Sequence, residues 1–218
     1  MPSEDLLIEI GTEELPPRLL MTAAASFSDR LSTALESAHL CNDSVVYYAT
    51  PRRLAVIIRN LVDTQPEQHE IRRGPAVAAA YDEDGQPTKA ALGFARSCGV
   101  DVTQLGRLET DKGQWLQYEA VRPGSPMTAL IGDLVNDAIS GVTIERAMRW
   151  GSQRTEFIRP VQWVSLIYGS EVVEAEILGL STGDRSSGHR FMDSGVFSLA
   201  PASSYLETLR AHYVIADP

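Results

Sequence analysis

Two stretches dense in arginine and tryptophan contain the side chains of this sequence best suited to bind a ligand. The first holds Arg149 and Trp150, and the second, residues 156–163, holds Arg159 and Trp163. Guanidinium groups bind phosphates and aromatic rings stack on unpaired bases, so this pattern favours contact with single-stranded RNA or with a partner protein. The alternative is that the tryptophans belong to the core and the arginines pack over them. The sequence leaves both interpretations open.

Further basic motifs occur elsewhere in the chain. One pair of arginines lies between two apolar segments, a second pair precedes Gly74-Pro75, and a histidine-arginine pair follows the glycine- and serine-rich residues 181–188. Each motif places a cation where a loop is expected, which is where binding residues concentrate. The candidates for RNA or subunit contact are therefore Arg52, Arg53, Arg72, Arg73, Arg149, Trp150, Arg159, His189 and Arg190.

Three acids near the N-terminus, Glu9, Glu13 and Glu14, form the clearest carboxylate group. Carboxylate oxygens are the ligands that hard divalent cations prefer, so a metal site is one interpretation. The spacing is not diagnostic of a metal, and Arg52 and Arg53 are available as partners. We therefore favour buried ion pairs and assign no metal site.

No residue is assigned a catalytic role. The chain lacks the GxGxxG and GxxxxGK[ST] patterns of phosphate-binding loops. His189 lies close to Ser186 and Ser187, but the GxSxG turn that exposes a nucleophilic serine is missing. A structural histidine is therefore favoured over a general base. A hydrolase would require a pocket that joins His189 to a carboxylate or to an activated water.

The charge of the chain limits how it could contact RNA. Its 218 residues carry a formal net charge of −10, with only Lys89 and Lys112 as lysines. Binding to phosphates needs concentrated cations, so any RNA contact must be local and the chain does not have the composition of a DNA-binding domain.

Other features bear on the cellular compartment. No apolar run reaches 18 residues and the N-terminus is acidic, so we expect neither a membrane span nor a secretory signal. Cys41 and Cys98 show no zinc or disulfide spacing and are interpreted as two buried thiols. These observations predict a cytoplasmic protein without a bound metal.

The first 64 residues should begin the main domain. Residues 6–10 are an apolar run typical of a buried strand, and Pro16-Pro17 should start a helix that continues to Leu40. Residues 45–49 and 54–62 are predicted to be two further strands.

A smaller α+β lobe is expected to be inserted at residues 65–124. Its polar beginning, residues 63–70, has no periodicity and is interpreted as a linker. A helix capped by Thr88 should cover residues 89–98, and a hairpin should close around residues 111–113.

The main domain should resume over residues 125–218. We expect helices at 127–139 and 203–210, a hairpin of strands 161–167 and 172–178, and a strand at 213–216. Together with residues 1–64 this predicts an α+β fold in which a mixed or antiparallel sheet packs against helices.

The motifs together resemble a known family. Residues 6–18, 49–56, 148–163 and 187–191 occur in the order found in the N-terminal part of the β subunit of bacterial tetrameric glycyl-tRNA synthetase. Residues 73–75 and 85–95 resemble the central region of that part, and Lys112-Gly113 follows at the expected place. The resemblance spans essentially the whole chain.

The resemblance implies an α2β2 ligase that attaches glycine to tRNA-Gly using ATP and Mg²⁺. It also implies that the aminoacylation site lies on the α subunit, while the β subunit serves tRNA binding and assembly. In agreement with that division, the class I and class II synthetase motifs are absent. The expected partners are therefore the α subunit and tRNA-Gly, with no membrane and no cofactor in this chain, which should be inactive alone. The alternatives are a purely structural scaffold and an editing-like hydrolase.

Overall fold

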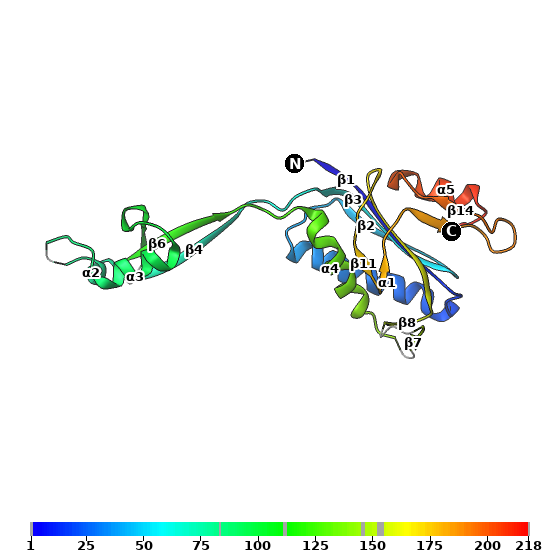
Figure 1. The fold of residues 1–218 in the computed structure, drawn as a ribbon, viewed down its shortest axis with the longest axis horizontal. Coiled ribbons are helices and arrows are strands. Elements are labelled where there is room, and N and C mark those ends of the chain that lie inside the picture. Colours follow the sequence, from blue (N-terminus) through cyan, green and yellow to red (C-terminus); the bar gives the residue numbers. More distant parts are fainter. Residues whose placement is uncertain (1, 83, 111–112, 145–146, 152–154, 218) are drawn as a thin grey trace. The chain divides into compact units, whose positions relative to one another are not determined.

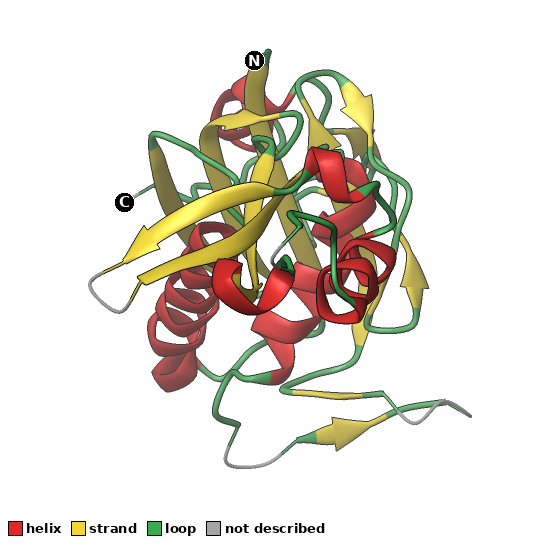
Figure 2. Cartoon of the chain, turned by 90° about the vertical axis from the view of Figure 1, so that its left-hand side faces the viewer, coloured by secondary structure: helices red, strands yellow, loops and turns green. Residues whose placement is uncertain are grey.

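The computed structural model describes residues 2–82, 84–110, 113–144, 147–151 and 155–217. The chain forms two compact units. The first unit comprises Met1–Gln65 with Ser125–Pro218, and the second comprises Pro66–Gly124. Both contain helices and strands, drawn in red and yellow in Figure 2, and the predicted α+β class is confirmed.

A five-stranded antiparallel sheet forms the centre of the first unit. Its strand order is β10-β9-β1-β3-β2, so the N-terminal strand lies in the middle. The five strands are β1 (Ser3–Thr12), β2 (Ser44–Thr50), β3 (Arg53–Val62), β9 (Val161–Tyr168) and β10 (Glu171–Val172).

Helices cover both faces of this sheet (Figure 1). The long helices α1 (Pro17–Ser37) and α4 (Met127–Ser140) pack on one face, where Leu6 and Ile8 of β1 join the main core. The short helices η2 (Ala202–Ser204) and α5 (Tyr205–Ala211) pack on the other face, against Leu7. Because alternate side chains point to opposite faces and both faces are buried, β1 reads as a continuous apolar run.

The start of α1 follows from its sequence. Pro17 stands at the first helical position, where its missing N–H costs nothing and its fixed φ suits the helix. Phe27, Leu31 and Leu35 then recur at intervals of four residues and are buried against the sheet.

Short antiparallel pairs complete the first unit. These strands are β7 (Met148–Arg149) with β8 (Glu156–Phe157), β11 (Glu176–Ile177) with β12 (Leu180–Ser181), and β13 (Arg185–Ser187) with β14 (Val196–Ser198). No helix in the described part of the chain is both long and apolar enough to span a membrane.

The second unit is a three-stranded antiparallel sheet with helices. Its strands lie in the order β4-β6-β5 and its core contains Ala80, Ala91 and Leu116. The elements are β4 (Gln68–Ala76), α2 (Val77–Ala80), α3 (Lys89–Cys98), η1 (Val102–Gln104), β5 (Gly106–Thr110) and β6 (Gly113–Arg122). Of the predicted hairpin turn, residues 111 and 112 lie outside the described part.

Two sequence predictions about strands need correction. β4 begins at Gln68, within the stretch interpreted as a linker. Most of its side chains are exposed, so no apolar alternation marked it. Residues 213–216 were predicted to be a strand but join no sheet. Val214 and Ala216 are buried in the second core cluster, so their alternation reflects packing onto the face of the sheet without strand pairing.

The strand predicted at residues 172–178 is broken. β10 ends at Val172, and the Thr182 hydroxyl then donates to the Val173 carbonyl (2.6 Å) and accepts from the Ala175 amide (2.8 Å). Side-chain bonds to the backbone thus replace strand-ladder bonds at this position.

The interpretation of the cysteines as two buried thiols is also wrong, because Cys41 is exposed and Cys98 is partly exposed. Cys41 directly follows the buried Leu40, where the chain has left α1, and its carbonyl accepts the Val62 amide. The backbone holds this position, so the side chain is free to face outward.

Candidate functional site

Three of the sequence motifs meet at one end of the central sheet. In the register, Gly11 of β1 lies between Arg53 of β3 and Trp163 of β9, and Glu9 lies one row further along. Glu9 and Gly11 are two residues apart, so they face the same side of the sheet as Arg53 and Trp163. That side is the one covered by Tyr205 of α5.

Glu9 is a fully buried carboxylate surrounded by donors. Its Oε1 accepts from Trp163 Nε1 at 2.8 Å and from the Ser186 hydroxyl. Its Oε2 accepts from Arg53 Nη1 at 3.2 Å and from the Tyr205 hydroxyl at 2.6 Å. Burial, and then the charge of Glu9, raise the pKa of Tyr205 well above its ordinary value, which keeps the phenol a donor. The charge of Glu9 is thus compensated inside the protein.

The predicted ion pair between the N-terminal acids and the 52–53 arginines is present as Glu9–Arg53. The Arg53 side chain is only 2% exposed, and it also donates to the Ser186 hydroxyl (3.0 Å) and to the Ser187 carbonyl (2.6 Å). The chain's own groups therefore bond both Nη atoms of this guanidinium, while its buried Nε has no partner among the described residues. For Arg53 the scaffold interpretation fits better than a direct RNA contact.

Trp163 lies flat across Gly11. A Cβ added at Gly11 would come within 1.9 Å of the Trp163 ring, so only glycine leaves the ring its place. The guanidinium carbons of Arg52 and Arg53 lie 5.9 and 5.8 Å from the centroid of the same ring, within cation–π range. The indole therefore joins the buried Glu9 network to Arg52.

The other two N-terminal acids have separate partners. Glu13 accepts from Gln162 at 3.2 Å and Glu14 pairs with Arg190 at 3.3 Å, while the Glu14 carbonyl accepts from Arg159 Nε at 3.1 Å. Among the described residues, no group of three His, Cys, Asp or Glu side chains is placed to hold a metal ion. The arrangement matches the ion-pair interpretation of these acids.

A cleft of about 330 Å³ opens beside this network. Its charged and aromatic lining comes from three segments distant in sequence, namely Glu14, the 52–53 arginines and residues 189–191. Arg52 is partly buried, and its Nε has no hydrogen-bond partner among the described residues. Arg52 and Arg53, which both line the cleft, therefore each keep a buried guanidinium N–H that no described residue satisfies.

His189 presents a donor rather than a base. Its Nδ1 accepts from the backbone amides of Phe191 (3.3 Å) and Met192 (3.2 Å). This bonding pattern assigns the hydrogen of the neutral ring to Nε2. The assignment argues against a general-base role and makes His189 a hydrogen-bond donor at the cleft.

The loop that carries His189 and Arg190 is held at both ends. A Cβ at Gly188 would lie 2.3 Å from the Asp193 carbonyl, so glycine permits this close approach. Asp193 also bonds the His212 ring, which stacks on Phe197 at 3.7 Å. The hydrogen bond from His212, and then the Gly195 amide, lower the pKa of the Asp193 carboxyl. These contacts position the loop before any ligand binds.

The remaining candidates lie away from the cleft lining. Arg149 is exposed and pairs with Glu156, and Trp150 packs half-buried against the main core. Arg159 is partly exposed, and its Nη1 lies 3.0 Å from the Met148 sulfur.

Arg72 and Arg73 belong to the second unit. Arg72 pairs with Glu70 at 3.0 Å, and the Arg73 guanidinium lies 3.7 Å from the centre of the Trp115 ring. Both side chains are exposed on β4. Both arginines thus have partners within the second unit.

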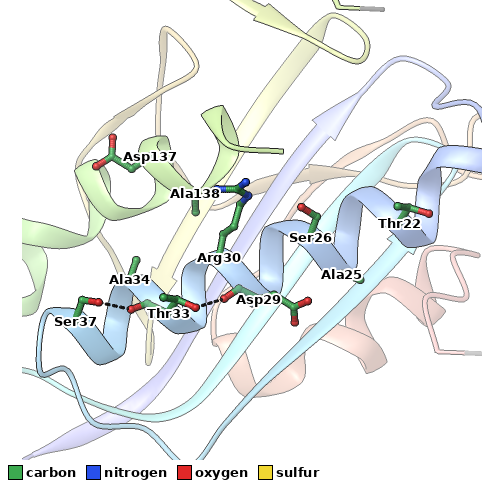
Figure 3. Close-up of a pocket in the computed structure, with 10 residues that line it drawn as sticks. All are labelled: Thr22, Ala25, Ser26, Asp29, Arg30, Thr33, Ala34, Ser37, Asp137 and Ala138. Carbon is green, nitrogen blue, oxygen red and sulfur yellow. Dashed lines mark hydrogen bonds between the residues drawn. The ribbon is translucent and has the colours of Figure 1, made fainter. Parts of the chain in front are cut away.

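A second, larger hollow contains none of these motifs. It runs along α1 toward α4, with a volume of about 760 Å³ (Figure 3). Two of its hydroxyls, those of Thr33 and Ser37, donate to carbonyls of their own helix. Its charged groups, Asp29, Arg30 and Asp137, form no cluster that indicates a reaction.

Sequence reasoning missed Tyr205 and Tyr213, and it weighed Ser186 only as a possible nucleophile beside His189. Ser186 and Tyr205 bond Glu9, and Tyr213 lines the cleft. A buried tyrosine is expected to have a hydrogen-bond partner for its hydroxyl, and Tyr205 could have been singled out on that ground. Nothing in the local sequence indicated that the partner would be Glu9, which lies 196 positions earlier.

Comparison with known proteins shows which family this chain resembles. A family model described as "Glycyl-tRNA synthetase beta subunit" matches residues 6–218. Proteins named "Glycine--tRNA ligase beta subunit" from Alteromonas mediterranea and Chromohalobacter salexigens are 46% and 48% identical over 217 residues. A protein of the same name from Hahella chejuensis is 43% identical over 218 residues. Each alignment covers 100% of this chain and 31 or 32% of the relative, so the chain spans about a third of their length.

Proposed function

The chain belongs to the glycyl-tRNA synthetase beta subunit family, and from this we propose that it is the N-terminal part of such a subunit, binding tRNA and supporting assembly with an alpha subunit. The match over residues 6–218 carries this proposal, because it includes every motif that forms the buried network and the cleft. The enzyme would attach glycine to tRNA-Gly in the cytoplasm.

The division of labour within that enzyme is also part of the proposal. ATP and Mg²⁺ would bind the alpha subunit, and this chain would contribute no catalytic group. The described residues support that assignment, because His189 is a donor, and Glu9 is buried under four donors. Neither group is placed to activate a water, so an editing-like hydrolase receives no support.

The second candidate function is a purely structural scaffold. The observation in its favour is the Glu9–Arg53 pair, whose burial and internal bonds account for two conspicuous motifs without any ligand. The exposed Arg149 and Arg190, however, are not needed by the core, because surface ion pairs contribute little stability. We therefore favour a contact role for these side chains.

The proposed function can be tested with the full-length protein and its alpha subunit. Binding of labelled tRNA-Gly would be measured between about 50 and 200 mM salt for wild type, Arg149→Ala and Arg159→Ala. We expect affinity to fall with salt, and each variant to weaken binding if its arginine contacts a phosphate. Arg30→Ala is the matched control, since Arg30 is an exposed arginine on α1.

Association with the alpha subunit would be measured in parallel by analytical ultracentrifugation. Loss of tRNA affinity with intact assembly supports the RNA role, whereas loss of assembly in the same variants supports subunit contact. If wild type binds tRNA-Gly and the alpha subunit, but both arginine variants match Arg30→Ala, the scaffold function is the better description of these motifs.

A further inference from the structure

The cleft beside the Glu9 network has a local charge opposite to that of the whole chain. Three arginines and one glutamate line it, although the chain carries a net charge of −10. Glu14 pairs with Arg190 at 3.3 Å and the buried Glu9 pairs with Arg53 at 3.2 Å, so among the described residues Arg52 supplies the uncompensated positive charge. An acidic protein that gathers cations in one cleft is suited to bind an anion there.

The donors of the cleft are also arranged for an anion. The guanidinium of Arg52 lines the cleft and its buried Nε has no hydrogen-bond partner among the described residues, and the His189 ring, whose Nδ1 accepts two backbone amides, can donate only through Nε2. A phosphate oxygen could accept from both of these side chains. The Arg190 guanidinium lines the same cleft and adds positive charge.

Exposed rings and apolar side chains lie next to these donors. Phe191 is 86% exposed and Tyr213 is 55% exposed, and both line the cleft together with Ile215. Large apolar side chains gathered at one exposed place indicate a binding surface. An aromatic ring beside a guanidinium is the usual means of holding an unpaired base and its phosphate.

The size of the cleft selects among nucleic-acid ligands. A volume of about 330 Å³ is at the lower end of small-molecule sites, which span about 300 to 1,000 Å³. Such a space suits a single nucleotide and is too small for a duplex. Its loop is already held by the Asp193–His212 contact and by the two amides on His189, so little ordering would be required on binding.

We propose that this cleft binds one unpaired nucleotide of RNA, with its phosphate at Arg52 and His189 and its base stacked on Phe191 or Tyr213. The inference rests on the proposed tRNA-binding function and adds a site and a mode of recognition to it. It assigns Phe191, which is almost fully exposed, a role that core packing does not provide.

The experiment uses the full-length protein assembled with the alpha subunit and labelled tRNA-Gly as the probe. Phe191→Leu keeps an apolar side chain but removes the ring, whereas Phe191→Tyr keeps the ring. Stacking of one base contributes about 1 to 3 kcal/mol. We therefore expect Phe191→Leu to weaken tRNA binding roughly 5- to 160-fold and Phe191→Tyr to bind within about twofold of wild type. Met192→Ala, an exposed neighbour outside the cleft lining, should also match wild type.

Arg52→Gln provides a second, independent measurement. If Arg52 holds a phosphate, its loss should reduce the slope of log affinity against log salt by about 0.7, the value for a single-strand phosphate. Phe191→Leu should leave that slope unchanged, because stacking displaces no counterion. The pair of variants thus separates phosphate binding from base stacking.

The outcomes distinguish the inference from the function on which it rests. If wild type fails to bind tRNA-Gly, the proposed function itself is wrong. If wild type binds but Phe191→Leu and Arg52→Gln leave both affinity and salt slope unchanged, only the nucleotide site is overturned. If these variants instead release the alpha subunit while retaining tRNA affinity, the cleft is a protein-docking surface and the inference is likewise overturned.

Discussion

Glu9 accepts hydrogen bonds from four side chains that lie on four different elements of the chain. These donors are Arg53, Trp163, Ser186 and Tyr205. Because a buried carboxylate is strongly destabilising unless it is paired and hydrogen-bonded, each donor becomes a structural requirement of this end of the sheet. The register of β1, β3 and β9 observed here brings two of these donors, Arg53 and Trp163, to the buried charge.

Replacing Arg53 should cause a large loss of stability. Arg53→Met keeps much of the side-chain volume but leaves Glu9 buried beside an apolar group, which costs about 3 to 5 kcal/mol. The free energy of unfolding in urea would measure this loss. The control is Arg59→Ala, which removes a partly exposed ion pair with Asp5 and should cost about 1 kcal/mol or less. Equal losses in the two variants would contradict a buried role for Arg53.

Residue types indicated part of this chemistry beforehand. Three acids followed by paired arginines indicated ion pairs, and the Glu9–Arg53 bond is one of them. The role of His189 could not be inferred in the same way. It depends on the amides of Phe191 and Met192, whose direction follows from the loop conformation.

At the scale of elements, strands β1 and β9 approach each other closely at Gly11 and Trp163. The two residues are register partners, and the indole covers the space where a side chain would stand. Its Nε1 reaches Glu9 from that position. The absence of a side chain at Gly11 is therefore what allows the indole to cap the buried carboxylate.

Gly11→Ala should displace the indole from this position. The added Cβ would lie within 1.9 Å of the ring, so we expect a loss of about 2 kcal/mol or more and an altered indole environment. Thermal unfolding and tryptophan fluorescence would measure both effects. Gly183→Ala, in the same unit, adds a Cβ with no neighbour within 4 Å and should be nearly neutral. A neutral Gly11→Ala would contradict the close approach.

Elements with an apolar face were predictable, and exposed or irregular ones were not. The repeat of Phe27, Leu31 and Leu35 predicted α1, because burying one face requires that spacing. β4 gave no such signal, because most of its side chains face solvent. Its pairing with β6 comes from backbone hydrogen bonds, which residue types report only weakly.

At the scale of the whole molecule, the chain leaves the first unit and returns to it at adjacent points. The Gln65 amide donates to the Ser125 carbonyl at 3.0 Å, and the Ser125 amide donates to the Gln65 side chain at 3.2 Å. Thr64 and Pro126 form an isolated bridge beside them. The first unit therefore brings residues 65 and 125 together with its own contacts.

Replacing residues 66–124 by a short glycine-serine linker should leave the first unit folded. The linker has only to join residues 65 and 125, which already bond each other. A shorter loop also costs less entropy to close. We expect the unfolding midpoint of the first unit, measured by circular dichroism in urea, to be unchanged or higher. A loss of cooperative unfolding would show that the first unit depends on the second. As a contrast, inserting the same linker at residue 193 should lower the stability of the first unit, because Asp193 holds the loop that carries His189 and Arg190.

By itself, the sequence determined the fold class, the long helices, most strands of the central sheet and the resemblance that the family match confirms. These properties follow from local spacing, because burial of one face imposes a period that is visible in the residue types. Family motifs are likewise local strings of residues. The fold class, the long helices and the family motifs can therefore be recognised in the unfolded sequence.

Only the tertiary structure decided which motif residues meet and which face outward. Arg52 and Arg53 are adjacent in sequence and both line the cleft, yet Arg53 is almost fully buried and bonds Glu9 and Ser187, while Arg52 is only partly buried. The reason is the alternation of side chains combined with long-range pairing: the register of β1, β3 and β9 places Arg53 beside Glu9. Contacts between residues 44 to 196 positions apart have no local signature. They form only when the strands pair into the sheet and its two faces are covered.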